Sequence, residues 1–230
     1  MLRLDDAAFR QGAFDLAADL EITAGKVTAV IGPSGAGKST LLHGIAGFVP
    51  QTGGRMVWQG DEVHRLPPDR RPVSMLFQDN NLFPHLSVMQ NVALALTHRL
   101  RPSAEVQARV EQMLQNVGLS GLSARKPAGL SGGQQSRVAL ARALLQDRPI
   151  MLMDEPFSAL GPGLKAEMLD LSLGLAGERT VVMVTHDPQD AARIAEYVIG
   201  VVSGQADPPV ETARFLRCPP EHFQTYFGRS

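Results

Sequence analysis

The feature that most constrains this chain is a glycine-rich segment, GPSGAGKST at residues 32–40. It lies between an apolar, β-rich run at residues 27–31 and a helical pattern at residues 39–48. Glycines at such a junction let backbone N–H groups close around a phosphate, and the positive end of the helix dipole points at the same place. The segment fits the pattern G-x-x-x-x-G-K-[ST], which predicts a nucleotide phosphate site. The predicted phosphate-binding residues are Gly32, Pro33, Ser34, Gly35, Ala36, Gly37, Lys38, Ser39 and Thr40.

Two side chains of this segment have specific predicted roles. We expect Lys38 to reach the outer phosphates and the Ser39 hydroxyl to bind Mg²⁺. The alternative, a glycine-rich turn with no ligand, is disfavoured because the pattern stands directly between a strand and a helix, which is the context that this loop requires.

The rest of the chain alternates apolar strand patterns with helical patterns. This alternation indicates an α/β fold with a mainly parallel sheet that is covered on both faces. Further strands are predicted at 72–77, 149–156, 180–187 and 198–204, with a hairpin at 55–63 that turns at Gly60. Further helices are predicted at 102–119 with Ser103 as N-cap and Gly118 as C-terminal stop, and at 187–198 with Asp187 as N-cap.

Composition narrows the class of protein. Hydrophobic residues make up 44% of the 230 residues, which is enough for a folded core, and the net charge of -1 gives no sign of a nucleic-acid partner. The single cysteine, Cys218, excludes an internal disulfide and indicates a reducing compartment. The N-terminus does not read as a signal peptide, and no apolar run approaches the roughly 20 residues needed to cross a bilayer. We therefore expect a cytosolic chain, or one bound to a membrane through another protein.

Polar side chains follow the predicted strands where the strands end. Asp154 and Glu155 close the run IMLMDEP, His186 closes VMVTHD, and Gln78 closes VSMLFQ. Open α/β sheets bind ligands at that edge. We expect Asp154 to hold Mg²⁺ and Glu155 to accept a proton from the attacking water, since neighbouring strand residues point to opposite faces. Without the phosphate loop, a solvated strand end would be the better interpretation.

A second anion site is predicted at LSGGQ, residues 130–134. Ser131 caps a predicted helix whose first residues are glycines, so free backbone N–H groups point outward there. One nucleotide does not obviously need two such sites in one chain.

Taken together, these motifs resemble those of the ATP-binding subunits of ABC transporters. The shared motifs are the phosphate loop at 32–40, Gln78, LSGGQ at 130–134, MDEP at 153–156 and His186, in that order, and the resemblance covers roughly residues 1 to 205. It implies a P-loop ATPase core of about residues 1–78 and 140–205, with a small antiparallel β subdomain. An inserted helical subdomain of about residues 79–139 and a short tail at 206–230 would complete a single domain.

The resemblance also implies roles for residues and partners. Two such domains pair head to tail, so Ser131, Gly132, Gly133 and Gln134 would act on the ATP held by the partner copy. His186 would contact the γ-phosphate, and Gln78 would be both a catalytic residue and a metal ligand. An aromatic residue near the N-terminus stacks on adenine, for which Phe9 is the first candidate and Phe14 the second. Either could instead be an ordinary strand residue.

The resemblance further implies a membrane partner. The helical subdomain would receive a short helix from an integral membrane permease, and Leu82, Phe83 and Pro84 could line the receiving groove or pack internally. The chain would then be a peripheral protein on the cytoplasmic face of the inner membrane. A periplasmic solute-binding protein would act on it indirectly.

A narrower resemblance is to the ATP-binding subunits of bacterial thiamine importers. It is carried by residues 70–96, PFSAL at 156–160 and HDPQDAARIA at 186–195. Importers of iron, molybdate, sulfate or polyamines share all the ATPase motifs and remain alternatives. Non-transport ATPases with LSGGQ-like motifs are a further class, but the chain has neither their long heptad insertions nor a second cassette.

One position departs from the pattern. After PFSAL the family usually has an aspartate in a loop that crosses the dimer interface, and this chain has Gly161 followed by Pro162 and Gly163. The missing carboxylate either weakens communication between the two ATP sites or is tolerated drift in a loop.

Overall fold

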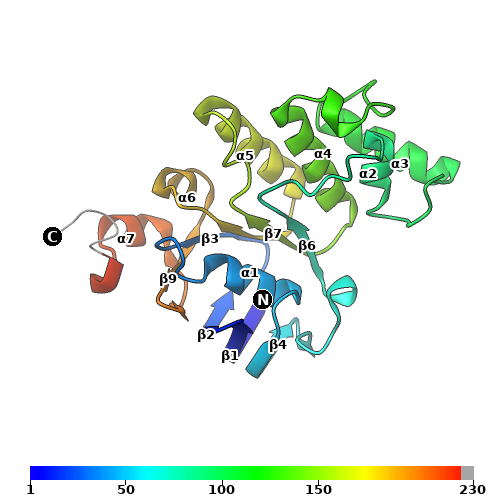
Figure 1. Cartoon of the computed structure of the whole chain (residues 1–230). Helices are drawn as coiled ribbons and strands as arrows, with labels where there is room; N and C mark the ends of the chain where they lie inside the picture. The colour runs from blue at the N-terminus through cyan, green and yellow to red at the C-terminus, as the bar shows by residue number, and fades with distance from the viewer. Residues whose placement is uncertain (224–230) are drawn as a thin grey trace. The chain divides into compact units, whose positions relative to one another are not determined.

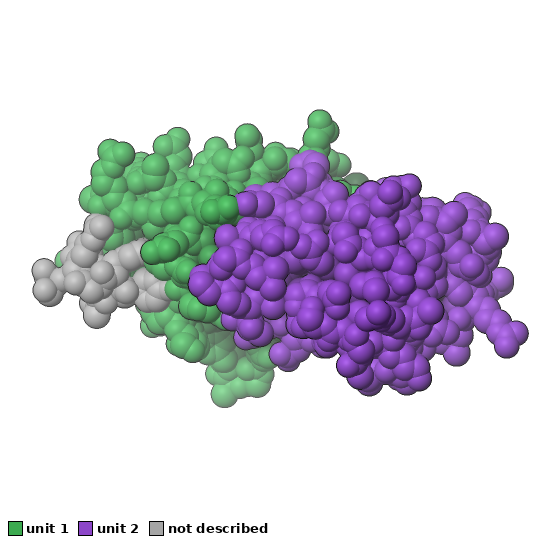
Figure 2. Space-filling model, turned by 90° about the horizontal axis from the view of Figure 1, so that it is seen from above, with its two compact units in different colours: residues 1–73, 149–155, 178–230 green, residues 74–148, 156–177 purple. Residues whose placement is uncertain are grey.

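The structure, a computed structural model, describes residues 1–223, and it divides the chain into two compact units. Unit 1 comprises residues 1–73, 149–155 and 178–230, and unit 2 comprises residues 74–148 and 156–177 (Figure 2). The predicted subdomain boundaries stay a prediction, because packing alone does not define a catalytic core. The predicted tail is described only as far as residue 223.

Unit 1 is built on a mixed sheet with the strand order β5-β4-β1-β2-β10-β9-β3-β8-β7, and β11 pairs with β9 (Figure 1). Strands β3, β8 and β7 are parallel and almost wholly buried, as expected of apolar runs in a covered sheet. Their bounds are β3 Val27–Ile31, β7 Ile150–Asp154, β8 Thr180–Val184 and β9 Tyr197–Val202.

The other part of the sheet is mainly antiparallel, although β10 pairs with β2 in parallel. Strand β2 alternates buried and exposed residues along its length, the pattern of a sheet with one face in water. The strands are β1 Leu2–Gln11, β2 Phe14–Ile22, β4 Gln51–Trp58 and β5 Asp61–Glu62, with the short strands β10 Gln205–Ala206 and β11 Val210–Glu211. The predicted turn at Gly60 joins β4 to β5 with φ +99°, a conformation that glycine adopts freely.

Within the described residues, the α-helices of unit 1 are α1 Lys38–Ala46, α6 Pro188–Ile194 and α7 Thr212–Arg217. Helix α1 follows the phosphate loop as predicted and ends at Gly47, which has φ +89°. The prediction for α6 was too long, because Tyr197 pairs with Thr28 in the sheet and so belongs to β9. The amide of Glu196 already bonds to the carbonyl of Val27.

Unit 2 contains strand β6 Val73–Leu76, which begins at its border, and the helices α2 Val88–Ala93, α3 Ala104–Asn116, α4 Gly132–Leu145 and α5 Pro162–Ala176 (Figure 1). Ser103 caps α3 and Gly118 follows its end with φ +71°, which confirms both sequence signals. Val110 and Leu114 of α3 are completely buried. Within residues 1–223, no helix is long and apolar enough to cross a membrane.

Candidate functional site

The phosphate loop is shaped by glycines that no other residue could replace without rearrangement. A side chain at Gly32 would collide with the backbone carbonyl of Val201, so the loop packs directly against β9. Gly37 has φ +110°, and a side chain there would meet Leu16 at 2.7 Å and Phe14 at 2.9 Å. The loop conformation therefore depends on residues far away in the sequence.

Lys38 stands at the start of α1 and is 7% exposed. Its Nζ donates to the carbonyls of Gly32 and Pro33, both at 2.9 Å. Burial lowers the pKa of the Lys38 ammonium, while the carboxylates of Glu155 and Asp154 oppose this shift. The amine is thus held over the loop by two carbonyls, which an incoming phosphate would replace as stronger acceptors.

A cavity of about 330 Å³ lies over the loop. Its lining combines an aromatic side chain, backbone and hydroxyl groups of the loop, and a carboxylate. The lining residues are Gln11, Phe14, Ser34, Gly35, Gly37, Lys38, Ser39, Thr40 and Glu155. Gln11 holds Thr40 through a 3.0 Å hydrogen bond, so the end of β1 helps to shape the cavity.

Two of the three predicted Mg²⁺ ligands, Ser39 and Asp154, lie next to each other. The Ser39 hydroxyl donates to Oδ1 of Asp154 over 2.9 Å, and Asp154 is 6% exposed at the end of β7. Mg²⁺ binds through one or two oxygen side chains and completes its shell with phosphates and water. A hydroxyl and a carboxylate beside a phosphate loop fit that donor set.

Glu155 and His186 also come together. Strands β7 and β8 are parallel neighbours, so their ends meet, and Nδ1 of His186 lies 3.2 Å from Oε2 of Glu155. Glu155 has φ +41°, an uncommon conformation for a residue with a side chain, and such strain concentrates at functional sites. Thr185, which precedes His186 in the chain, donates to Asp190 over 2.7 Å and so supports the segment after β8.

The prediction for Phe9 was wrong. Phe9 is completely buried, and its ring lies where a side chain on Gly44 would be, so it packs against α1 and leaves no face for adenine. Phe14, the second candidate, is half-buried and lines the cavity over the loop. Leu2 and Leu4 are buried before an irregularity in β1, and Ala7 and Phe9 are buried after it, so a strict period of two counted from Leu2 would have placed Phe9 outward.

The LSGGQ segment opens helix α4 in unit 2. Ser131 accepts from the amide of Gln134, and the Gln134 side chain accepts from the amide of Ser131, which together form a capping box. The first-turn amides of Gly132 and Gly133 have no carbonyl one turn earlier to pair with. Ser131 and Gly132 are exposed, so the start of this helix is accessible to a ligand.

The other predicted residues of unit 2 are also accessible. Gln78 is exposed in the turn after β6, and Phe83 is 46% exposed in the loop before α2. Their predicted roles stay predictions. Gly161 is the N-cap of α5 with φ -63°, and no side chain caps that helix. Any residue can adopt this backbone conformation, so the missing aspartate is not excluded by backbone geometry.

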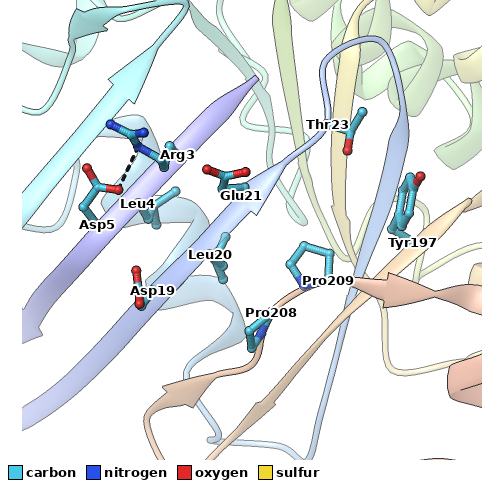
Figure 3. A pocket seen from close by; sticks show the side chains of 10 residues that line it. All are labelled: Arg3, Leu4, Asp5, Asp19, Leu20, Glu21, Thr23, Tyr197, Pro208 and Pro209. Atoms are coloured by element: carbon cyan, nitrogen blue, oxygen red, sulfur yellow. Dashed lines mark ion pairs between the residues drawn. The ribbon is translucent and has the colours of Figure 1, made fainter.

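A larger hollow, of about 460 Å³, lies elsewhere on unit 1 (Figure 3). Its lining includes charged residues of β1 and β2, namely Arg3, Asp5, Asp19 and Glu21. Arg3 forms an ion pair with Asp5 at 2.8 Å. It has no phosphate loop and no helix start among its lining residues. Size alone therefore does not identify the functional site.

Sequence reasoning missed two residues that the structure brings to the phosphate loop. Gln11 bonds to Thr40, and His43 on α1 lies 3.3 Å from Asp154. For His43 a signal existed, because it follows Ser39 by four residues and so shares its helix face. No local signal could have placed Gln11.

Comparisons with known proteins agree with this geometry. The thiamine import ATP-binding protein ThiQ of Cereibacter sphaeroides is 54% identical over 230 residues, covering 99% of this chain and 100% of the relative. The protein of the same name from Yersinia pseudotuberculosis is 46% identical over 209 residues, covering 90% and 89%. Residues 17–158 match the family described as ABC transporter.

Solved structures extend the likeness to the fold. A dimeric ATP-binding cassette in a post-hydrolysis state, bound to ADP and Pi, is 30% identical with a TM-score of 0.77, covering 92% of this chain and 99% of its own. An ABC transporter cassette in its ADP conformation is 25% identical with a TM-score of 0.86, covering 100% and 99%. The predicted fold class, a P-loop ABC ATPase core, is confirmed. The chain therefore belongs to the ABC transporter family.

Proposed function

We propose that this chain is the ATP-hydrolysing subunit of an importer, and that the imported solute is thiamine. The observation that carries the ATPase proposal is the cavity over the phosphate loop, which Lys38 and Glu155 line and beside which Ser39 donates to Asp154. The names of relatives that match the whole length of the chain support thiamine as the solute. The ATPase subunit does not contact the transported vitamin, so none of its residues can identify thiamine by chemistry.

In the proposed reaction, Lys38 binds the β- and γ-phosphates and the backbone amides of the loop hold the rest of the chain of phosphates. Phe14 stacks on adenine in place of Phe9. Ser39 and Asp154 would hold Mg²⁺, which supplies charge neutralisation at the phosphate oxygens.

Water attacks the γ-phosphorus, Glu155 accepts its proton, and ADP leaves with the electrons of the broken bond. In this proposal His186, which lies 3.2 Å from Glu155, contacts the γ-phosphate. The role of Gln78 rests on the family resemblance alone.

The role of Glu155 can be tested by Glu155→Gln. The amide keeps the shape of the side chain but cannot accept the proton, so ATP binding should persist while hydrolysis falls by at least about 100-fold, the lower end for loss of a general base. Glu178→Gln, an exposed carboxylate of unit 1, is the control and should hydrolyse ATP normally. Hydrolysis by Glu155→Gln at the rate of the unsubstituted chain would rule out Glu155 as the base.

We also propose that two copies pair head to tail, so that Ser131, Gly132, Gly133 and Gln134 complete the partner's ATP site. The exposed start of α4 supports this, as does the dimeric state of the similar cassette. Each nucleotide would then need one phosphate site from each copy, which explains the two anion sites in one chain.

Mixed dimers distinguish pairing in trans from action in cis. A mixture of Lys38→Ala and Ser131→Arg chains places both defects in one site and leaves the other site complete. We expect the mixture to regain part of the activity that each variant lacks alone. A mixture as inactive as its components would contradict the head-to-tail arrangement.

The partners complete the proposal: an integral membrane permease, with which Phe83 and its neighbours would make contact, and indirectly a periplasmic thiamine-binding protein. The chain would sit at the cytoplasmic face of the inner membrane. Reconstitution with these partners should show ATPase stimulation by thiamine and none by a control vitamin. Stimulation by another solute alone would overturn the thiamine assignment and leave the ATPase proposal intact.

A further inference from the structure

We propose that His43 is a positioning residue that holds the carboxylate of Asp154 in the orientation needed for Mg²⁺. The inference rests on the proposed ATPase function and adds a residue to its metal site. Nε2 of His43 lies 3.3 Å from Oδ2 of Asp154, while Ser39 donates to Oδ1 of the same carboxylate. Each oxygen of Asp154 thus faces a different side chain of α1.

The helix itself creates this arrangement. Residues four apart lie on one face of a helix, so Ser39 and His43 reach the same carboxylate at the end of β7. The other side chains of the middle of α1 are apolar and fully buried, including Leu41, Leu42 and Ile45. The His43 side chain among them is 27% exposed and has Asp154, whose side chain is 8% exposed, as a polar neighbour.

His43 is supported on its other side by an aromatic ring. The rings of His43 and Phe48 are 6.3 Å apart and nearly perpendicular, at 84°. This edge-to-face contact restricts the imidazole to a position beside Asp154. The Nε2 atom is buried and lies 3.3 Å from Oδ2 of Asp154, which is long for a contact with a carboxylate. Such contacts commonly tighten when the ligand binds.

The role follows from how the carboxylate is held. As a metal ligand, the Ser39 hydroxyl would bind through an oxygen lone pair and could still donate its proton to Oδ1 of Asp154. His43 contacts the other oxygen, Oδ2, so it would limit rotation of the carboxylate. Outer partners of metal ligands commonly change metal affinity by about 10- to 100-fold when removed.

The test measures metal binding rather than turnover. Mn²⁺ is titrated by electron paramagnetic resonance into the full chain saturated with a non-hydrolysable ATP analogue. Because the 3.3 Å contact is long, we expect His43→Leu to weaken Mn²⁺ binding by about 10-fold, the lower end of that range. Analogue binding without metal should not change. His43→Gln, whose amide nitrogen reaches as far as Nε2, should bind Mn²⁺ as the unsubstituted chain does.

A second pair provides a matched control. His222 and Asp207 form another imidazole–carboxylate contact in unit 1, at 2.7 Å, and neither residue lines the cavity over the phosphate loop. His222→Leu should leave Mn²⁺ binding unchanged. In steady-state assays, His43→Leu should raise the Mg²⁺ concentration for half-maximal rate more than it lowers the maximal rate.

Three results would overturn the inference: unchanged Mn²⁺ affinity in His43→Leu, equal weakening in His43→Leu and His43→Gln, or equal weakening in His222→Leu. If His43→Leu does not fold, His43→Asn replaces it, since its amide is too short to reach Asp154 and should also weaken binding. Failure of the unsubstituted chain to bind the analogue would instead contradict the proposed ATPase function.

Discussion

Arg71 is the buried cation that ties the far end of α1 to the loop that follows β5. It is 5% exposed, and burial lowers the pKa of its guanidinium. Nη1 donates to the carbonyls of Gly44 and Ile45 at 2.7 and 2.8 Å, at the C-terminal end of α1. Nη2 and Nε donate to the carbonyls of His64 and Leu66 at 2.9 and 3.0 Å.

We predict that Arg71→Met destabilises the chain by about 3 kcal/mol. Methionine fills similar space but donates no hydrogen bond, so the carbonyls of Gly44 and Ile45 lose their charged partner. A hydrogen bond to a charged group contributes about 1.5–3 kcal/mol, and we count these two at the lower value. The carbonyls of His64 and Leu66 lie on a loop that can relax toward water, so they are left out. For a chain of this length the loss corresponds to a fall in Tm of roughly 6 to 12 °C.

The measurement is thermal and urea unfolding of the isolated chain, followed by circular dichroism. Arg70→Met is the matched control, because Arg70 is exposed one residue earlier and should change stability by less than about 0.5 kcal/mol. Saturating ATP should raise the Tm of Arg71→Met and of the unsubstituted chain by similar amounts, since Arg71 lies at the opposite end of α1 from Lys38. Equal stability of the two variants would refute the reasoning, because the buried contacts would then contribute nothing net.

Three further predictions concern the nucleotide site and the loop after β7. Lys38→Ala should weaken ATP binding by about 10- to 100-fold in calorimetry, the equivalent of one charged hydrogen bond, while Lys26→Ala, an exposed lysine paired with Glu196 at 3.5 Å, should not. Phe14→Ala should weaken ATP binding by at least about fivefold through lost stacking yet leave inorganic triphosphate binding unchanged; equal losses for both ligands would contradict adenine stacking. Gly161→Asp should stabilise the chain by a few tenths of a kcal/mol by capping α5, and it should raise the Hill coefficient of ATP hydrolysis if the missing carboxylate limits communication between two sites. Unchanged cooperativity with the same or higher Tm would leave tolerated drift as the explanation.

The alternation of apolar strands with helices could be predicted from the sequence, because the local pattern of apolar and polar residues indicates which faces are buried. Strand β3 and the caps of α3 and α4 lie where local signals placed them. The end of α6 lies earlier than local signals predicted, because the last residues of the predicted helix pair with β3 instead. Helical propensity extends through that segment, but the sheet offers Tyr197 and Val198 hydrogen bonds that a longer helix could not match.

The sequence by itself determined which residues are proposed for the site, since the phosphate loop, the acids at the end of β7 and the LSGGQ segment are contiguous motifs. Only the tertiary structure decided which aromatic ring is available, because the exposure of Phe9 and Phe14 depends on whether α1 covers them. It also brought His43 to Asp154, although the two residues lie 111 positions apart in the sequence. Such contacts follow from how strands and helices pack, which no local pattern of residues records.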